Sequence, residues 1–206
     1  LPFLLCISAV TLAGSQGLTQ ALFGGFDSLL LFVDTGEILR LAAVAFLLML
    51  PFFFGALAIG LIFTIETERI GSYYFANMFG SGIGSILGLL GLSLLLPQQV
   101  QPLCALLALA AGAVLLTGAC RAVHIGILFG LVLVTAAIFA PAQLHLSQYK
   151  DLSRTLDLPE AKIVAHRPAA AGQIHIVSSP VLRSAAGVSL NWSGSMPNTQ
   201  AIFVNG

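Results

Sequence analysis

Residues 40–65, "RLAAVAFLLMLPFFFGALAIGLIFTI", decide the class of this protein. After Arg40 the run holds no charged residue, and it is longer than the roughly 20 apolar helical residues that cross a hydrocarbon core of about 30 Å. Because irregular backbone cannot satisfy its polar groups in lipid, the run predicts a membrane-spanning helix. Pro51 lies near its middle, where we expect a packing kink, with a transport hinge as the alternative.

Apolar runs on both sides of this segment extend the interpretation. They cover residues 73–96, 103–120 and 124–140, and a partial run, 1–13, precedes them. The whole chain is 58% hydrophobic and 8% charged, whereas soluble proteins are about 25% charged. The sequence therefore predicts a membrane α-helical bundle of about four to five transmembrane helices in residues 1–144, with the lipid bilayer as its partner.

The run at 73–96 carries a helical face of small residues, formed by Gly80, Gly84, Gly88 and Gly91 with Ser81 and Ser85 beside them. Small residues let two helices approach closely in a membrane. We therefore expect tight helix packing there, and the Gly80/Gly84/Gly88 face is a candidate contact between copies of the chain.

Charged residues within 1–144 fall in the connections between these runs. In "ETERIG", residues 66–71, we expect a solvated loop, and the alternative is a gating salt bridge centred on Arg69. Asp27, Asp34 and Glu37 lie in a Gly-rich connection. We interpret this connection as a water-exposed loop rather than a cation site, because no histidine accompanies the carboxylates at metal-ligand spacing.

The distribution of basic residues gives a direction to the helices. Arg69 and Arg121 fall on one side of the predicted bundle, whereas Arg40, Lys150 and Arg154 fall on the other. Since short cytoplasmic segments are enriched in Lys and Arg, this count favours a cytoplasmic C-terminal region.

Residues 145–206 differ from the preceding part in composition, because half of the sixteen charged residues lie in this shorter segment. A short amphipathic element in "SQYKDLSRTLDLPEAKIV" (147–164) ends at Pro159, and "QIHIV" (173–177) alternates with the period of a half-buried strand. Further strands are expected at "VSLNW" (188–192) and "AIFV" (201–204). The segment predicts a linker followed by a small antiparallel β-sheet domain.

Familiar catalytic and metal-binding patterns do not emerge from the sequence. Cys6, Cys104 and Cys120 sit in apolar runs and read as buried hydrophobic residues. The histidines, which are His124, His145, His166 and His175, are scattered without metal-ligand spacing. The net charge is zero and no Lys/Arg cluster occurs, so we expect neither a metal site nor nucleic-acid binding.

The two ends suggest a piece of a longer protein. The chain starts on "LPFLLCISAVTLAG" with no basic segment ahead of it, so this run does not resemble a signal peptide. It stops on "QAIFVNG", a strand followed by the hairpin-turn pair Asn205–Gly206. We expect the sheet to be incomplete at its C-terminus.

The tail carries a family resemblance. Residues 40–206 resemble membrane-attached spermidine synthase-like proteins, which belong to the polyamine aminopropyltransferase family. Four segments carry the resemblance in chain order: "ERIGSYYFANMFGSGIGSILG", "QYKDLSRTLDLPEAKIV", "GQIHIV" and "SPVLRSAAGVSLNWSGSMPNTQAIFVNG". The resemblance implies transmembrane helices, a linker, a strand segment with Gln-x-Ile, and an Asp-Gly turn just ahead of a Rossmann-like domain.

In this family Gln173 would lie against the nucleoside substrate at the edge of the active site, where an amide can both donate and accept hydrogen bonds. Gly172 stands where the family has an aromatic residue, and Asn205 where it has aspartate. The resemblance implies that the catalytic aspartate and the groups that hold decarboxylated S-adenosylmethionine belong to the missing C-terminal Rossmann-like domain. The 206 residues would then hold no catalytic residue and no cofactor.

The resemblance makes the chain the membrane anchor and amino-terminal sheet of an aminopropyltransferase. The full-length protein would transfer an aminopropyl group from decarboxylated S-adenosylmethionine to an amine such as putrescine, at a bacterial-type inner membrane. Two alternatives stay open: a transporter-like protein, and helices that only anchor and oligomerise, each with the sheet as a soluble appendage.

Overall fold

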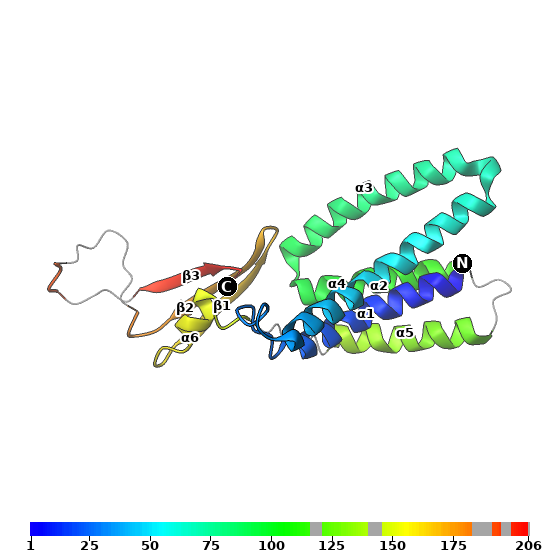
Figure 1. The fold of residues 1–206 in the computed structure, drawn as a ribbon. Helices are drawn as coiled ribbons and strands as arrows, with labels where there is room; N and C mark the ends of the chain where they lie inside the picture. The colour runs from blue at the N-terminus through cyan, green and yellow to red at the C-terminus, as the bar shows by residue number, and fades with distance from the viewer. Residues whose placement is uncertain (116–120, 140–145, 183–190, 195–198, 206) are drawn as a thin grey trace. The chain divides into compact units, whose positions relative to one another are not determined.

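The computed structural model describes residues 1–115, 121–139, 146–182, 191–194 and 199–205. Its helices are α1 (Pro2–Phe23), α2 (Thr35–Ile65), the short 3₁₀ helix η1 (Thr67–Arg69), α3 (Ile70–Leu94), α4 (Pro97–Val114), α5 (Arg121–Phe139) and α6 (Asp151–Leu156) (Figure 1). Its strands are β1 (Lys162–Ala169), β2 (Gly172–Ser178) and β3 (Gln200–Val204). The chain forms two compact units, Leu1–Gly88 with Pro97–His145 and Leu89–Leu96 with Leu146–Gly206.

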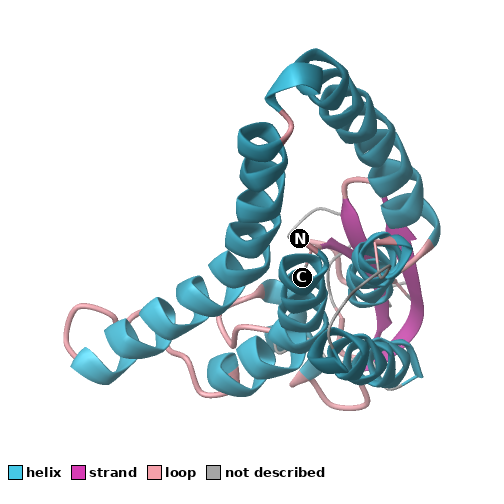
Figure 2. Ribbon diagram, turned by 90° about the vertical axis from the view of Figure 1, so that its right-hand side faces the viewer, coloured by secondary structure: helices cyan, strands magenta, loops and turns pink. Residues whose placement is uncertain are grey.

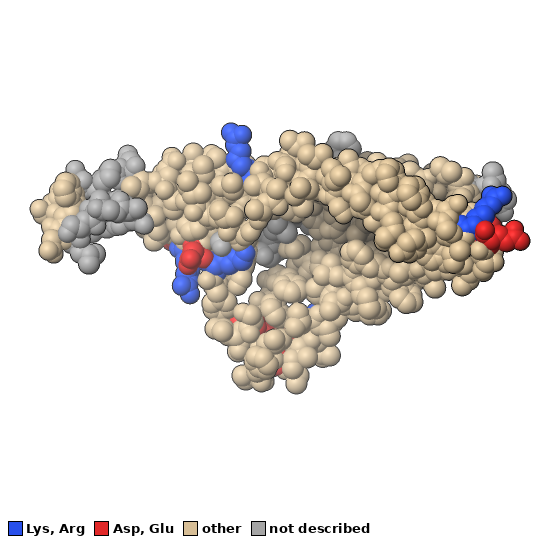
Figure 3. Space-filling view, turned by 90° about the horizontal axis from the view of Figure 1, so that it is seen from above, with Lys and Arg blue, Asp and Glu red and all other residues tan. Residues whose placement is uncertain are grey.

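Three helical segments are long and apolar enough to cross a membrane: Pro2–Phe23, Thr35–Ile65 and Thr67–Leu94. Figure 3 shows charged side chains gathered in a few small groups, with most of the visible surface uncharged. The protein is therefore a membrane protein, as predicted. In α5 the apolar stretch is shorter, His124–Ala137, so a total of four to five spans stays a prediction.

The connection between α1 and α2 is shorter than the sequence suggested. Helix α1 continues to Phe23, well beyond the partial run 1–13, and α2 begins at Thr35, where the Asp34 carboxylate accepts a hydrogen bond from the Gly36 N–H at 2.8 Å. The expectation of a water-exposed loop was wrong for Glu37, which is buried in the first turn of α2. Its carboxylate pairs with Arg40 at 2.7 Å and accepts from the Asp27 N–H at 3.2 Å.

Helix α1 is the centre of the helical unit and packs against α2, α4 and α5. The buried cluster consists of Cys6, Ala9, Ala13, Ala105, Leu109 and Val134. The α1 members recur at spacings of three and four, so they share one face of the helix. Because these side chains are small, α4 and α5 approach α1 closely, as is typical of membrane helices.

Polar side chains link the same helices. The Ser8 hydroxyl donates to the Pro51 carbonyl of α2 at 2.8 Å, and the Gln101 amide of α4 donates to the Leu12 carbonyl at 2.7 Å and to the Ser15 hydroxyl at 2.9 Å. Pro51 is buried inside α2. It therefore sits in a helix contact, the setting in which lipid-embedded proline is tolerated.

Helix α3 has no buried residue. A Cβ added at Gly80, Gly84 or Gly88 would meet nothing within 4 Å, and in Figure 1 no other helix packs along α3. The predicted small-residue face thus exists, but within the described residues it contacts no other helix of this chain. The tight packing of small residues occurs on α1 instead.

The second unit contains a three-stranded antiparallel sheet in the order β1–β2–β3, which confirms the predicted sheet (Figure 2). Ala170 and Ala171 form the two-residue turn between β1 and β2. Helix α6 ends before Pro159 and packs on β2. Leu152 of α6 and Val177 of β2 are both 0% exposed. Of the strand expected at 188–192, residues 188–190 lie outside the described residues, and Asn191 and Trp192 are not in a strand.

Candidate functional site

The polar site of the second unit lies on the sheet face that includes Gln173, His175 and Val177 of β2, here called the inner face. These three residues are buried and alternate with the half-buried residues of the opposite face. Pairing between strands places His166 of β1 and Phe203 of β3 on either side of His175. The inner face therefore carries one continuous row of three rings.

Gln173, the predicted substrate-binding residue, is 8% exposed and forms a hydrogen-bonded pair with Asn205. The Asn205 side-chain oxygen accepts from the Gln173 N–H at 3.0 Å, and the Asn205 N–H donates to the Gln173 carbonyl at 2.8 Å. The Asn205 side-chain amide also donates to the Ala171 carbonyl at 3.2 Å. Asn205 therefore holds the first turn of the hairpin against the end of β3.

Gly172 is required by the same contact. Its φ is +139°, and an added Cβ would lie 1.8 Å from the Asn205 side-chain oxygen. Only glycine adopts such a backbone conformation without strain. Asn205 itself has φ +64°, in the left-handed region that asparagine tolerates. An aromatic residue, which the family resemblance places at 172, is therefore incompatible with this position of the Asn205 amide.

The two histidines of the sheet stack on one another, with ring centroids 4.2 Å apart and planes inclined by 15°. The His166 Nε2 atom lies 3.0 Å from the Gln173 side-chain oxygen. Because that oxygen is an acceptor, the contact favours the tautomer of His166 that carries its proton on Nε2. The contact also fixes the direction of the Gln173 amide.

His175 is a buried base in this site. It is 8% exposed, and its Nδ1 atom is buried without a hydrogen-bond partner. Burial lowers the pKa of His175, and the neighbouring His166 and Lys150 lower this pKa further. The Lys150 ammonium donates to the Asn205 carbonyl. His175 is therefore held in the neutral form in a polar cluster that already contains one cation.

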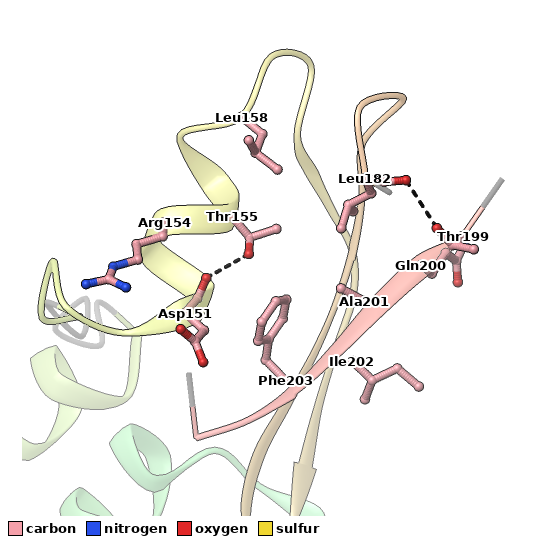
Figure 4. A pocket seen from close by; sticks show the side chains of 10 residues that line it. All are labelled: Asp151, Arg154, Thr155, Leu158, Leu182, Thr199, Gln200, Ala201, Ile202 and Phe203. Carbon is pink, nitrogen blue, oxygen red and sulfur yellow. Dashed lines mark hydrogen bonds between the residues drawn. The ribbon is translucent and has the colours of Figure 1, made fainter. Parts of the chain in front are cut away.

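A groove of about 820 Å³ borders the inner face between α6 and β3 (Figure 4). Its lining residues are Asp151, Arg154, Thr155, Leu158, Leu182, Thr199, Gln200, Ala201, Ile202 and Phe203. Figure 4 shows the Phe203 ring in the space facing α6. Since Phe203 pairs with His175, the groove adjoins the row of rings.

The other residues that the sequence singled out include the cysteines, His145 and the charged residues of "ETERIG", and none of those that the structure describes belongs to this site. In the parts of the chain that the structure describes, no three His, Cys, Asp or Glu side chains form a metal-binding group. Cys6 is buried in the helical core, as expected, but Cys104 is exposed on α4, so its interpretation as a buried residue was wrong. Cys120 and His145 lie outside the described residues. Arg69 and the two glutamates of "ETERIG" are exposed at η1, and no ion pair joins them there.

Spacing along the chain concealed the histidine pair. His166 and His175 are nine residues apart and were interpreted as isolated, but each lies four residues from the two-residue turn. In a hairpin, equal distance from the turn places two residues opposite one another. The pairing of β1 with β2, rather than spacing along the chain, therefore brings the two rings together.

Comparison of the chain with protein-family models, with curated proteins and with solved structures gave no match.

Proposed function

We propose that this chain is the membrane anchor and amino-terminal sheet of a spermidine synthase-like aminopropyltransferase. The pairing of Gln173 with Asn205 is the observation that carries the proposal. The resemblance singles out these two positions, 32 residues apart, and they are joined in the folded sheet. A strand segment and a turn that belong to one site should meet in this way.

The neighbouring groove supports a small-molecule role for this face. Ligand pockets have volumes of about 300–1,000 Å³, and the groove between α6 and β3 falls within this range. Gln173 does not line the groove itself, but its side-chain amide, which His166 holds in one direction, lies on the same face of the sheet. A fixed amide recognises a base or a ribose at little entropic cost. We therefore assign Gln173 to nucleoside recognition.

In the proposed reaction, the nitrogen of a neutral amine attacks the propyl carbon of decarboxylated S-adenosylmethionine. The carbon–sulfur bond breaks, methylthioadenosine leaves, and the attacking nitrogen loses a proton to a base. The catalytic aspartate and most nucleoside contacts belong, in this proposal, to a C-terminal Rossmann-like domain. The protein then supplies orientation and a site from which water is excluded.

The test uses the full-length gene product in nanodiscs, with decarboxylated S-adenosylmethionine and a panel of diamines and polyamines. Mass spectrometry should detect methylthioadenosine together with an aminopropylated amine. Gln173→Ala should raise the KM for the nucleoside substrate by about three- to tenfold, the loss expected for one hydrogen bond. Ser178→Ala, in the same strand but on the opposite face, is the matched control. Failure of every amine to yield methylthioadenosine would reject the proposal.

We also infer the setting of the protein. The basic residues favour a cytoplasmic sheet unit at a bacterial-type inner membrane, with Arg69 and Arg121 on the opposite side. The exposed Gly80/Gly84/Gly88 face supports self-association through α3, because a helix in lipid gains packing only from another helix. Gly84→Leu should abolish cross-linking between copies in nanodiscs, and unchanged cross-linking would exclude this face.

A further inference from the structure

The sheet has a second apolar face, here called the outer face, opposite α6. It is formed by Ala165, Ile174, Ile176, Ile202 and Val204, which the strand pairing brings together. Ile202 is 67% exposed and Val204 is 58% exposed. Contiguous apolar surface of this kind marks an interaction site in a folded protein.

Two basic residues flank this apolar centre. Arg167 pairs with Ile174, and Lys162 pairs with Ser178. Both basic residues therefore belong to the outer face, and they lie at opposite ends of β1. Both side chains are exposed. The three strands contain no acidic residue. The outer face is therefore aliphatic in the middle and cationic along one margin.

We propose that the outer face docks on an anionic lipid surface. Isoleucine and valine side chains enter the boundary between headgroups and acyl chains, while lysine and arginine meet lipid phosphates. The cytoplasmic leaflet is the anionic one, which agrees with the orientation inferred from the basic residues. The proposal does not depend on the reaction that the protein supports.

The connection to the helical unit keeps the sheet near a bilayer. Residues 140–150 separate Phe139 of α5 from Asp151 of α6, and eleven residues span at most about 40 Å even when fully extended. Because the helical unit is embedded in the membrane, the sheet unit stays within this distance of the end of α5. A lipid surface is therefore always available to the outer face at high effective concentration.

Charge argues against a second copy as the occupant. If two outer faces met symmetrically, Lys162 and Arg167 of both chains would enter one interface, and no strand carries an acidic side chain to neutralise them. Like charges brought together in an interface are unfavourable. Lipid phosphates supply the missing negative charge.

A tryptophan scan across one strand tests the proposal on the complete chain in nanodiscs. Trp192 is the only tryptophan, so Trp192→Phe gives a silent background for Ile202→Trp on the outer face. Phe203→Trp is the matched control, because the adjacent residue points to the inner face. Brominated phosphatidylcholine, mixed with phosphatidylglycerol, quenches tryptophan only where it enters the lipid.

We expect strong quenching of the Ile202→Trp probe and little quenching of the Phe203→Trp probe. Replacing phosphatidylglycerol by a neutral lipid, or raising the salt concentration, should reduce the quenching. Lys162→Gln and Arg167→Gln should each weaken docking by about fivefold, the effect of one basic residue at an anionic surface.

Three outcomes would overturn the proposal. Blue-shifted emission from Ile202→Trp without bromine quenching would show that protein covers the face. Equal quenching at positions 202 and 203 would show insertion without a preferred face. Quenching that does not change with phosphatidylglycerol content or with substitution of the two basic residues would show that the face does not recognise an anionic surface. Amide exchange of β2 in each variant verifies that the sheet is folded, so that loss of quenching reports docking alone.

Discussion

Gly172 and Asn205 form a matched pair. The Asn205 amide occupies the volume in which any side chain at position 172 would lie, and in return it binds the backbone on both sides of that residue. Both residues differ from the pattern that the family resemblance leads us to expect. The two differences are linked, because the Asn205 amide can occupy this position only when residue 172 has no side chain.

The pair predicts a measurable coupling. Gly172→Ala should destabilise the sheet by about 2–4 kcal/mol, because it combines backbone strain with a steric clash. In an Asn205→Ala background the clash disappears, so the same change should cost at least about 1 kcal/mol less. Amide exchange of β2 peptides in the four variants measures this cycle. Strictly additive costs would contradict the coupling.

His175 makes the sheet sensitive to pH. The pKa of its imidazole is lowered by burial, by His166 and by Lys150, whereas in the unfolded chain the pKa is about 6.5. Above this value the group is neutral in both states and contributes no pH dependence. Below it the unfolded chain binds the proton first, so the free energy of unfolding falls as the pH falls.

We therefore expect faster amide exchange in β2, after correction for the intrinsic rate, as the pH is lowered from about 7.5 to about 5.5, with a loss of up to about 1.4 kcal/mol per pH unit for one group. His175→Phe keeps a flat ring in the stack and should remove most of this dependence. An unchanged pH profile in His175→Phe would assign the effect elsewhere.

Among the elements, α1 was the least predictable. Its sequence has Gly14, Ser15, Gln16 and Gly17 where a membrane helix would be expected to end, yet the helix continues to Phe23. The Gln101 amide of α4 donates hydrogen bonds to the Leu12 carbonyl and to the Ser15 hydroxyl at this stretch, and tertiary packing overrides local propensity in such cases. The glycine-rich α3 could be recognised as a helix from sequence, but its lack of a partner within the chain could not.

Glycine positions in the two kinds of helix should respond in opposite ways. A Cβ at Gly126 of α5 would lie 2.8 Å from the Cys6 sulfur, so Gly126→Ala should destabilise the helical unit by about 1–3 kcal/mol. At Gly84 of α3 the Cβ meets nothing, so Gly84→Ala should be neutral or stabilise the helix by up to about 1 kcal/mol. Thermal unfolding in detergent compares the two, and equal shifts would contradict the packing described here.

At the scale of the whole molecule, composition alone separated the lipid-embedded helices from the sheet. The separation was possible because helices in lipid must be apolar and almost uncharged, whereas a sheet in water carries charged residues. The inner-face site was harder to predict, since its members come from separate strands and from Lys150, which precedes α6. Register between strands, rather than local sequence, assembles them.

Topology provides a prediction at this scale. With a cytoplasmic sheet unit, Ser147→Cys should be protected from a membrane-impermeant maleimide in intact cells, whereas Thr67→Cys at η1 should react. Both single-cysteine variants are made in a background in which Cys6, Cys104 and Cys120 are replaced by alanine, and this background alone is the control. Labelling at position 147 together with protection at 67 would reverse the orientation.

The β-bulge and the proline of β1 bear on aggregation. The pairing is interrupted at Val164, and Pro168 has no N–H to offer another strand. Bulges and prolines are the features by which natural sheets block the addition of strands from other molecules. In the described part of the sheet, β3 carries neither feature along its outer edge. Within the described sheet, the β1 edge is therefore the one that is protected against the addition of a strand from another molecule.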